Sequence, residues 1–500
     1  MSFSPYPPGP FTSDWLLATA KRAAKGELSP HVTITHALDN AVRDQDDVLR
    51  ARLGFTGGPP ALTIYETPYG RVLLSESGKK NPNDLTRVQW YDRYAKLART
   101  MLDTFKPKKL AIVIENEAPL ELVAEAITCA MMSAHIFKTG NSEDTYYGPD
   151  ALYLVHTGVI EEGVEFASRL AVGLERGDFE NLARFLSSCP LNVIDVDKAA
   201  ELVYAMVSTN EHVKIHEPTP EEYARMGLLN GTCLGSGRPG RVIAIQIDPS
   251  SGTTTEVDID VAKGLVFDDG GANYKNEHVD QMEKDKSAAM RKLAKALYFI
   301  LHPERLKRTF VATLVLAENR IDGDACMHGD IWTAYDGRTM QDQNTDAEGR
   351  KVLADAIAWL VEKYANRINR LLTTATLTGH CVLAFGKNVS GLMVRGNDRA
   401  VFDKLEDIGL ACADRVHRLV VDPEDDKTMD AELADIRNVD GVRDRGAMKG
   451  AAFLWKFVPP SVKLVVHLDI ARVADEKGKN MADGIAPPGG FCWDIETHPQ

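Results

Sequence analysis

The chain has 500 residues, of which 44% are hydrophobic and 26% charged, and this length and composition predict a globular protein with at least two domains. Its formal net charge of -14 disfavours extended contact with the phosphates of DNA or RNA. No block of five or six lysines or arginines supplies a local basic surface. A nucleic-acid-binding function is therefore not expected.

The cysteines and the apolar runs indicate the compartment. The seven cysteines are dispersed without a CxxC or CxxH pair, which is typical of reduced thiols in the cytoplasm. No apolar run approaches the roughly 20 residues that a membrane-spanning helix needs. The amino-terminal segment has no hydrophobic signal core. We therefore expect a cytoplasmic protein that does not bind membranes.

The first third of the chain alternates helix-like and strand-like patterns, which indicates an α/β domain. A helix is predicted over 14–26, a buried strand over 110–115 and a second helix over 118–134. A long helical pattern follows over 161–188 and ends at the turn-forming stretch CPLNV. Another helix is predicted over 195–207.

Beyond the long helix, apolar strand-like runs alternate with helix-length segments. Strands are predicted at 241–248, 310–318, 381–386 and 463–471, and helices at 280–300 and 350–366. The last of these helices has an apolar face made of Val352, Leu353, Ala356, Trp359, Leu360 and Tyr364. Strands interleaved with helices predict a mixed, mostly parallel central sheet covered on both faces. We therefore expect an α/β protein with a smaller amino-terminal α/β domain (1–165), a linker helix (166–187) and a larger α/β catalytic domain (188–500).

A literal GxGxxG is present at Gly235, Gly237 and Gly240, but its context does not fit a dinucleotide site. That motif must follow a strand and open a helix, whereas here Pro239 interrupts it and a strand follows. The chain also has no phosphate-binding loop of the GxxxxGK[ST] type, no GxSxG elbow and no HExxH helix. Nucleotide-binding, serine-hydrolase and HExxH-type metalloprotease readings therefore lack their usual motifs.

Two short stretches carry candidate chemistry. In NTDAEGR (344–350), Asp346, Glu348 and Arg350 stand at alternate positions, and an extended segment would point all three to one face. In KGLVFDDGG (263–271), a strand-like run ends at Asp268, and Lys275 follows. Taken alone, the second stretch is an ordinary turn. The charged helical segment 279–290 is, by itself, a solvated helix face.

Together these stretches indicate a metal site. Strand ends in an α/β sheet converge at the carboxyl edge, so Asp268, Asp346 and Glu348 could share one pocket. Adjacent carboxylates repel each other unless cations neutralise them. Oxygen ligands suit Mg²⁺ or Mn²⁺, and carboxylates also accept Zn²⁺. The residues therefore predict a carboxylate-rich, dinuclear metal site with lysine and arginine nearby.

At these residues the sequence resembles the leucyl aminopeptidase family, also called cytosol aminopeptidases. NTDAEGRKVLADA is similar to the family's signature almost letter for letter, and KGLVFDDGG with Lys275 is similar to its K-G-[IL]-T-F-D-[ST]-G-G segment. TTATLTGH (373–380) resembles D-x-A-T-L-T-G-A, and LARFLSSCPLNV (182–193) resembles the opening of the catalytic domain. The resemblance is dense from about 182 to 472 and faint before that.

The resemblance implies a role for each matching residue. Two divalent metal ions per subunit, zinc or manganese with magnesium or cobalt as alternatives, would be bound by Lys263, Asp268, Asp285, Asp346 and Glu348. Lys263 would bind as a neutral amine, so its pKa would have to be strongly lowered. Lys275 would polarise the scissile carbonyl, and Arg350 would hold a bicarbonate that serves as general base. Thr376, Leu377 and Gly379 would line the substrate site.

The family's activity would make this chain a metal-dependent aminopeptidase that removes amino-terminal, leucine-type residues from peptides and forms a homohexamer. Several positions depart from the family pattern. In MEKDKSAAM (282–290) the spacing from Lys275 is one residue shorter and a glycine is lost, so Asp280 is an alternative to Asp285. Ala262, Asp269 and Thr373 also replace the usual Gly, Ser or Thr, and Asp. The alternatives are a catalytically impaired homologue that acts as an assembly or binding protein, and a DNA-binding regulator, which the negative charge disfavours.

Overall fold

The fold is taken from a computed structural model, which describes twelve stretches of the chain. They are residues 32–34, 62–67, 70–75, 85–105, 109–114, 118–131, 151–156, 163–207, 209–275, 285–386, 389–471 and 473. The chain divides into two compact units, and the division falls between Asp178 and Phe179, inside helix α5 (Gly163–Ser188). The domain limits at 165 and 187 remain a prediction.

The first unit is an α/β arrangement. Its parallel sheet has the strand order β1 (Val32–Ile34), β5 (Ala151–His156), β4 (Lys109–Ile114). A separate antiparallel pair is formed by β2 (Leu62–Thr67) and β3 (Gly70–Ser75), and the helices are α3 (Arg87–Phe105) and α4 (Leu120–Ala130). The strand predicted at 110–115 and the helices predicted at 118–134 and 161–188 are confirmed by β4, α4 and α5. The helix predicted at 14–26 lies outside the described residues.

The second unit contains an eight-stranded mixed sheet with the order β14-β13-β16-β12-β8-β9-β7-β6. The strands are β6 (Val213–His216), β7 (Arg241–Ile247), β8 (Val257–Asp268), β9 (Thr309–Asn319), β12 (Ile368–Ala375), β13 (Ser390–Val394), β14 (Val416–Arg418) and β16 (Leu464–Asp469). The four central strands, β16, β12, β8 and β9, are parallel to their neighbours in this group, whereas β13, β7 and β6 join antiparallel. The predicted mixed, mostly parallel sheet is confirmed.

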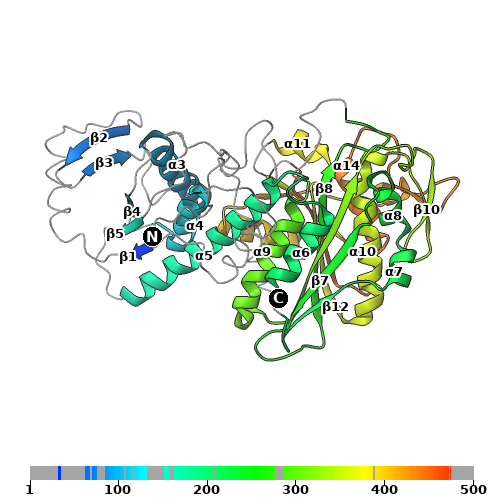
Figure 1. The fold of residues 1–500 in the computed structure, drawn as a ribbon, viewed down its shortest axis with the longest axis horizontal. Helices are drawn as coiled ribbons and strands as arrows, with labels where there is room; N and C mark the ends of the chain where they lie inside the picture. The colour runs from blue at the N-terminus through cyan, green and yellow to red at the C-terminus, as the bar shows by residue number, and fades with distance from the viewer. Residues whose placement is uncertain are drawn as a thin grey trace. The chain divides into compact units, whose positions relative to one another are not determined.

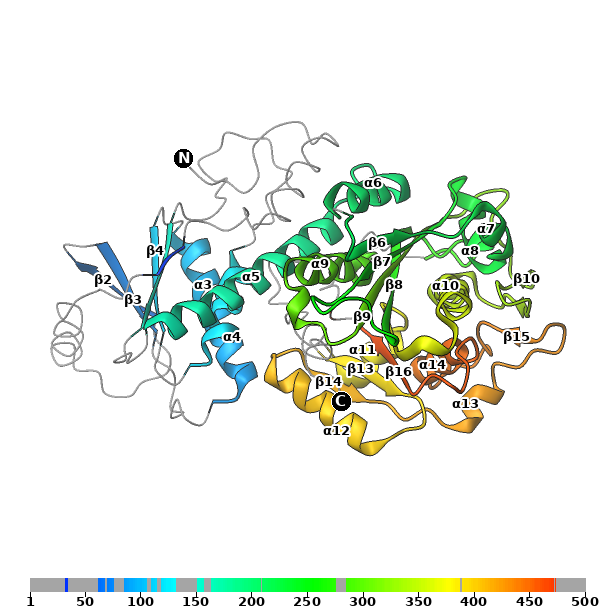
Figure 2. The same cartoon turned by 90° about the horizontal axis from the view of Figure 1, so that it is seen from below.

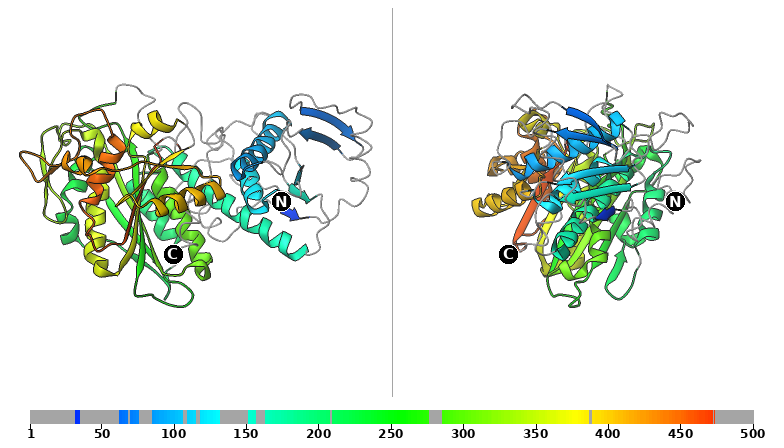
Figure 3. Two further views of the ribbon diagram at one scale, coloured as in Figure 1. Left: turned by 180° about the vertical axis from the view of Figure 1, so that it is seen from behind. Right: turned by 90° about the vertical axis from the view of Figure 1, so that its left-hand side faces the viewer.

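Helices cover both faces of this sheet. Figure 2 shows α9 (Ser287–Leu301) on one side of β7 and β8 and α10 (Glu348–Tyr364) on the other. Helix α14 (Gly446–Trp455) lies beside α10 in Figure 2 and in the left view of Figure 3. The remaining helices are α6 (Val196–Met206), α7 (Pro220–Arg225), α8 (Gly227–Cys233), α11 (Gly379–Phe385), α12 (Arg399–Ala411) and α13 (Pro423–Lys427). The described residues also form a small sheet of β10 (Ile331–Thr333), β11 (Thr339–Gln341) and β15 (Ile436–Arg437), whose first strand is labelled in Figure 1.

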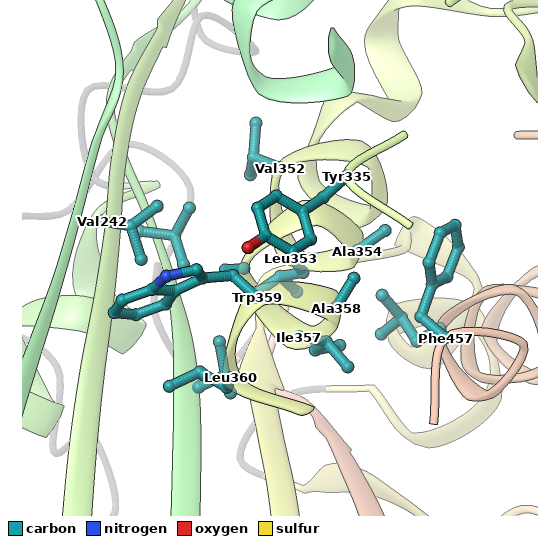
Figure 4. Close-up of a cluster of buried hydrophobic side chains, with 14 of the residues drawn as sticks. Val242, Tyr335, Val352, Leu353, Ala354, Ile357, Ala358, Trp359, Leu360 and Phe457 are labelled. Atoms are coloured by element: carbon teal, nitrogen blue, oxygen red, sulfur yellow. The ribbon is translucent and has the colours of Figure 1, made fainter. Parts of the chain in front are cut away.

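Helix α10 lies within a hydrophobic cluster of buried side chains (Figure 4). The predicted apolar face is confirmed, because all six of its residues are at most 3% exposed. The opposite side is buried as well, since Ala354, Ile357 and Ala358 pack toward Phe457 and its neighbours. Residues 348–360 of the helix are therefore all buried, and the exposed residues Glu362 and Lys363 lie in its last turn. Close packing around these buried turns holds the amino-terminal residues of the helix rigidly.

Two sequence-based assignments of secondary structure are wrong. The run 381–386 is not a strand but belongs to α11, which ends at Gly386 with a φ of 68°. A six-residue apolar run fits a strand or a buried helix equally well. Residues 344–350 are not extended either: a 3-10 turn (Thr345–Ala347) leads directly into α10. Asn344 stabilises that turn, because its side chain accepts a hydrogen bond from the Asp346 N–H at 3.0 Å.

The solvated interpretation of 279–290 is also wrong for the part that the structure describes. Residues 285–290 are all buried, including Asp285 and Lys286. Within the stretches that the structure describes, no helix is long and apolar enough to cross a membrane.

Candidate active site

Three carboxylates meet at the carboxyl end of β8. Asp268 is the last residue of that strand, Asp346 lies in the 3-10 turn, and Glu348 opens α10. One oxygen from each of the three lies within 4.8 Å of the others. Asp268 and Glu348 are buried and Asp346 is partly exposed. We call these three residues the carboxylate cluster, and the predicted convergence of Asp268, Asp346 and Glu348 is present in the structure.

Burial and the charge of Glu348 disfavour ionisation of Asp268 and Asp346, whereas Lys263 and Lys275 outweigh burial and lower the pKa of Glu348. Burial, followed by the charge of Glu348, raises the pKa of Asp268 well above its usual range. The same two causes raise the pKa of Asp346 to about 6. Cationic partners are therefore needed for all three groups to be ionised together at neutral pH.

Two lysines supply part of that positive charge. The Nζ of Lys263 lies 2.5 Å from Oδ2 of Asp285 and 2.9 Å from Oε1 of Glu348, and it donates to the carbonyl oxygen of Thr376 at 3.1 Å. The Nζ of Lys275 lies 3.1 Å from Oδ2 of Asp268 and also pairs with Asp346. Burial alone would lower the pKa of both lysines, but the surrounding carboxylates raise it above the usual range.

The charges of this group do not balance. Four carboxylates, those of Asp268, Asp285, Asp346 and Glu348, face the two ammonium groups of Lys263 and Lys275. The buried Oε2 of Glu348 has no hydrogen-bond partner among the residues that the structure describes. A set of oxygen donors with excess negative charge and an unsatisfied oxygen is suited to divalent cations.

A tight turn after β8 holds Asp268 in place. Its Oδ1 accepts hydrogen bonds from the N–H of Gly270 at 3.0 Å and from Nδ2 of Asn319 at 2.8 Å. Gly270 and Gly271 have φ values of 90° and 58°, which favour glycine. The additional acid Asp269 does not join the carboxylate cluster, because its Oδ1 accepts from the N–H groups of Gly271 and Ile321. Asp269 therefore stabilises the turn.

Arg350 lies next to this group, in the first turn of α10. Its Nη1 donates to the carbonyl oxygen of Asn438 at 2.7 Å. Burial lowers its pKa to about 10, although the charge of Glu348 opposes that change. Gly450 of α14 leaves room for the guanidinium, since a Cβ there would lie 3.4 Å from Nη2 and 2.9 Å from Cδ2 of Leu377.

The segment after β12 borders the site. The hydroxyl of Thr376 donates to Asp285, and the N–H of Leu377 donates to Oδ1 of Asp469 at 3.1 Å. Gly379 opens α11, and a Cβ on it would meet no atom within 4 Å. Thr376 therefore touches the charged group directly, whereas Leu377 and Gly379 lie on the backbone that continues from it.

The altered positions have visible consequences. Asp285 reaches Lys263 despite the shortened spacing, and Asp280 lies outside the described residues. Thr373, which stands where the family usually has Asp, pairs with Nδ1 of the buried His467 at 2.8 Å. Ala262 is fully buried in β8. The changes at Asp269 and Thr373 are thus absorbed by local hydrogen bonds.

The sequence interpretation missed three supporting residues: Asn319, Asn438 and Asp469. Asn319 and Asp469 are the last residues of β9 and β16, so the rule that strand ends converge could have identified them. Asp469 accepts from both the Leu377 N–H and the Thr378 hydroxyl. Asn438 follows the two-residue strand β15, which has too few residues to show a pattern.

Buried carboxylates at the carboxyl edge of a mostly parallel sheet define a class of candidate metal-dependent enzymes. Comparison with known proteins identifies the family. The sequence model described as "Cytosol aminopeptidase family, catalytic domain" matches residues 181–490. The chain belongs to this family, and it is accordingly a hydrolase of the metallo-exopeptidase class.

Named relatives agree with this assignment. A probable cytosol aminopeptidase of Chelativorans sp. is 31% identical over 423 residues, which cover 83% of this chain and 81% of the relative. One from Synechococcus elongatus is 31% identical over 418 residues, or 81% of each chain. Among solved structures, the bottromycin maturation enzyme BotP in complex with Mn is similar in fold, with a TM-score of 0.73 at 22% identity over 93% of this chain and 97% of that one.

Proposed function

We propose that this protein is a dinuclear metallo-aminopeptidase that removes the amino-terminal residue of peptides, with a preference for leucine-type side chains. The observation that carries the proposal is the buried group of four carboxylates and two lysines at the end of β8. Family membership supports the reaction class. The two-metal chemistry and the side-chain preference are inferred from the residues and from the resemblance.

The donor set fits two divalent ions. Asp268, Glu348, Lys263, Asp285 and Asp346 would hold the two ions. The excess negative charge and the unsatisfied Oε2 of Glu348 support this assignment. Oxygen ligands with one nitrogen suit manganese or zinc, with magnesium and cobalt as alternatives. The similar BotP structure is a complex with Mn, which supports testing that metal first.

Lys263 has to lose its proton to act as a ligand. Its ammonium is stabilised by Asp285 and Glu348, which outweigh the effect of burial on its pKa. Burial therefore does not suffice to produce the neutral amine, and the charge of the metal ions has to supply the difference. Metal binding should release a proton from Lys263.

The protein's own residues would divide the remaining work. When bound, the metal ions would lower the pKa of a water molecule and polarise the scissile carbonyl. Lys275 can donate a hydrogen bond to the oxygen that becomes negatively charged. Arg350 would hold a bicarbonate as general base, since its guanidinium is buried and oriented. Backbone groups of Leu377 and Gly379, with Thr376 beside them, would position the peptide.

Assembly and pH dependence extend the proposal. A homohexamer would have six times the 55.0 kDa mass of the chain, which light scattering after size exclusion can measure.

The α-amine of the substrate has a pKa of roughly 8 and binds a metal only when unprotonated. Turnover should therefore rise toward mildly alkaline pH, and a rate that is flat or favours acid would contradict metal binding by the amine.

The deciding experiment measures hydrolysis of Leu-7-amido-4-methylcoumarin after dialysis against Mn²⁺ or Zn²⁺, together with the metal content per chain. Glu348→Ala should abolish activity and lower the metal content. The matched control is Glu362→Ala on the same helix, where the carboxylate is exposed and pairs with Arg225, and activity should be kept. Absence of activity with either metal in a folded protein that binds fewer than two ions would support the catalytically impaired homologue instead.

A further inference from the structure

Asn438 lies at a point where two parts of the candidate site are joined. It follows β15, which pairs in parallel with β11, and its side chain is fully buried. Its main-chain carbonyl accepts the hydrogen bond from Nη1 of Arg350, which is 88 residues away in sequence. The position of this backbone oxygen therefore determines where one edge of the guanidinium lies.

The side chain of Asn438 fixes that backbone position. Its Nδ2 donates to Oδ1 of Asp342 at 2.8 Å and to the carbonyl of Asn344 at 2.7 Å. Its Oδ1 accepts from the N–H of Gln343 at 2.9 Å. The amide thus bonds to three successive residues that precede the 3-10 turn, while the same residue's carbonyl holds Arg350 just after the turn.

The network continues into α10. Oδ2 of Asp342 lies 2.5 Å from Nζ of Lys351, and both side chains are buried. Asn438 therefore contacts both ends of the NTDAEGR segment, its first residue Asn344 and its last residue Arg350. The Nε of Arg350 is buried and has no hydrogen-bond partner among the described residues, so the guanidinium depends on the contact at Nη1 for its orientation.

We infer that Asn438 is a positioning residue for the reaction, which acts through Arg350 and does not touch the substrate. This inference rests on the proposed function of Arg350. Removing the amide removes the three side-chain anchors to Asp342, Gln343 and Asn344. The Asn438 backbone then keeps the weaker bond from its N–H to the carbonyl of Gln341 at 3.3 Å, beside the short β11–β15 pairing. A long side chain that loses a fixed acceptor samples other rotamers, and a displacement of about 1 Å in a catalytic group can lower the rate up to roughly a hundredfold.

A double-mutant cycle tests the inference, with kcat, KM and bound metal measured for the wild type, Asn438→Ala, Arg350→Ala and the double variant. In the otherwise wild-type protein, Asn438→Ala should lower kcat about tenfold with little change in KM. In the Arg350→Ala background, the same substitution should change kcat by less than about twofold, since the group it positions is absent. The metal content should stay that of the wild type.

The other outcomes distinguish a failure of the inference about Asn438 from a failure of the proposed function of Arg350. An equal loss of kcat in both backgrounds, or a loss of bound metal in Asn438→Ala, would overturn the inference, because Asn438 would then act on general stability or on the metal-binding turn. Wild-type kcat in Arg350→Ala alone would overturn the proposed function of Arg350, and this inference with it. A lowered kcat in Arg350→Ala without coupling to Asn438 overturns the inference alone.

Two further variants keep the test decisive. Asn438→Ser retains a hydroxyl that can accept from Gln343, so it can replace Asn438→Ala in the cycle if the alanine variant does not fold. Asn230→Ala removes a bond of similar length, from Nδ2 to the carbonyl of Tyr223 at 2.8 Å. Among the described residues, no hydrogen bond joins Asn230 or Tyr223 to Arg350 or Asn438. It should leave kcat unchanged in both backgrounds.

Discussion

Gly349→Ala is the substitution for which the structure makes the sharpest prediction. Gly349 lies between Glu348 and Arg350 in the first turn of α10. A Cβ at this position would lie 2.7 Å from Cδ and 3.0 Å from Nζ of Lys263. Lys263 has little freedom to move away, because its Nζ is held at 2.5 Å from Asp285 and 2.9 Å from Glu348. The added methyl group must therefore displace the lysine from its carboxylate partners.

The expected effects on stability and activity differ in size. Alanine favours the helix over glycine by about 1 kcal/mol. Overpacking of a filled interior costs about 1–3 kcal/mol. The free energy of unfolding should therefore fall by no more than about 2 kcal/mol, the difference between these two effects. The displacement of Lys263 should instead lower kcat/KM about a hundredfold, because ligand geometry tolerates little error.

The assay compares kcat/KM for Leu-7-amido-4-methylcoumarin in Mn²⁺ with the thermal midpoint measured by circular dichroism. Gly323→Ala is the matched control, since a Cβ there would meet no atom within 4 Å and both quantities should stay unchanged. A Gly349→Ala protein with wild-type kcat/KM would refute the reasoning, because it would show that Lys263 can shift without affecting the reaction.

Three further predictions follow from charges and hydrogen bonds of the second unit. Mn²⁺ at 100 times its Kd should raise the free energy of unfolding of the wild type by about 2.7 kcal/mol and leave that of Glu348→Ala nearly unchanged, which a thermal-shift assay would measure. Equal increases of the thermal midpoint in the two proteins would contradict the role of Glu348 in binding the metal. Burial raises the pKa of Asp355 to about 7 in the folded protein, whereas in the unfolded chain this carboxyl ionises near pH 4. The free energy of unfolding of the wild type should therefore decrease as the pH rises from about 4 to about 7. The thermal midpoint of the wild type should accordingly drop relative to that of Asp355→Asn as the pH rises from 4 to 8, because the variant has no carboxyl to ionise at this position. A pH-independent difference between the two midpoints would argue against ionisation of Asp355. Asp469→Asn retains one of the two acceptors that hold Leu377 and Thr378, so kcat/KM should fall about tenfold with metal content unchanged, and lost metal would place Asp469 in the metal site.

Much of the catalytic unit could be predicted from local patterns. The apolar runs at 241–248, 310–318 and 463–471 are strands β7, β9 and β16, and 350–366 is helix α10. Long runs of one periodicity are reliable because burial of the whole segment decides them. The short apolar run at 381–386 was misassigned, since its helical state depends on what packs against it.

For the candidate site too, the sequence could predict some features and not others. The sequence by itself determined which residues could do the chemistry, because carboxylates and lysines at strand ends and turns stand out by type and position: Asp268, Lys275, Asp346 and Glu348. It also carried the motifs that place the chain in its family. These properties are local, so each could be read within a stretch of a few residues.

Only the tertiary structure decided how these residues meet. The path of NTDAEGR as a 3-10 turn and helix depends on Asn344, on the burial of residues 348–360 in α10 and on the distant Asn438. The pairing of Lys263 with Asp285 places a residue from a segment with a solvated pattern inside a buried charge group. Burial raises the pKa of Asp285, whereas the surrounding carboxylates raise that of Lys263 against the effect of burial. Helices α9 and α10 pack on opposite faces of the sheet that carries Lys263 (Figure 2). Such contacts join segments far apart in sequence, and no local pattern encodes which of them will form.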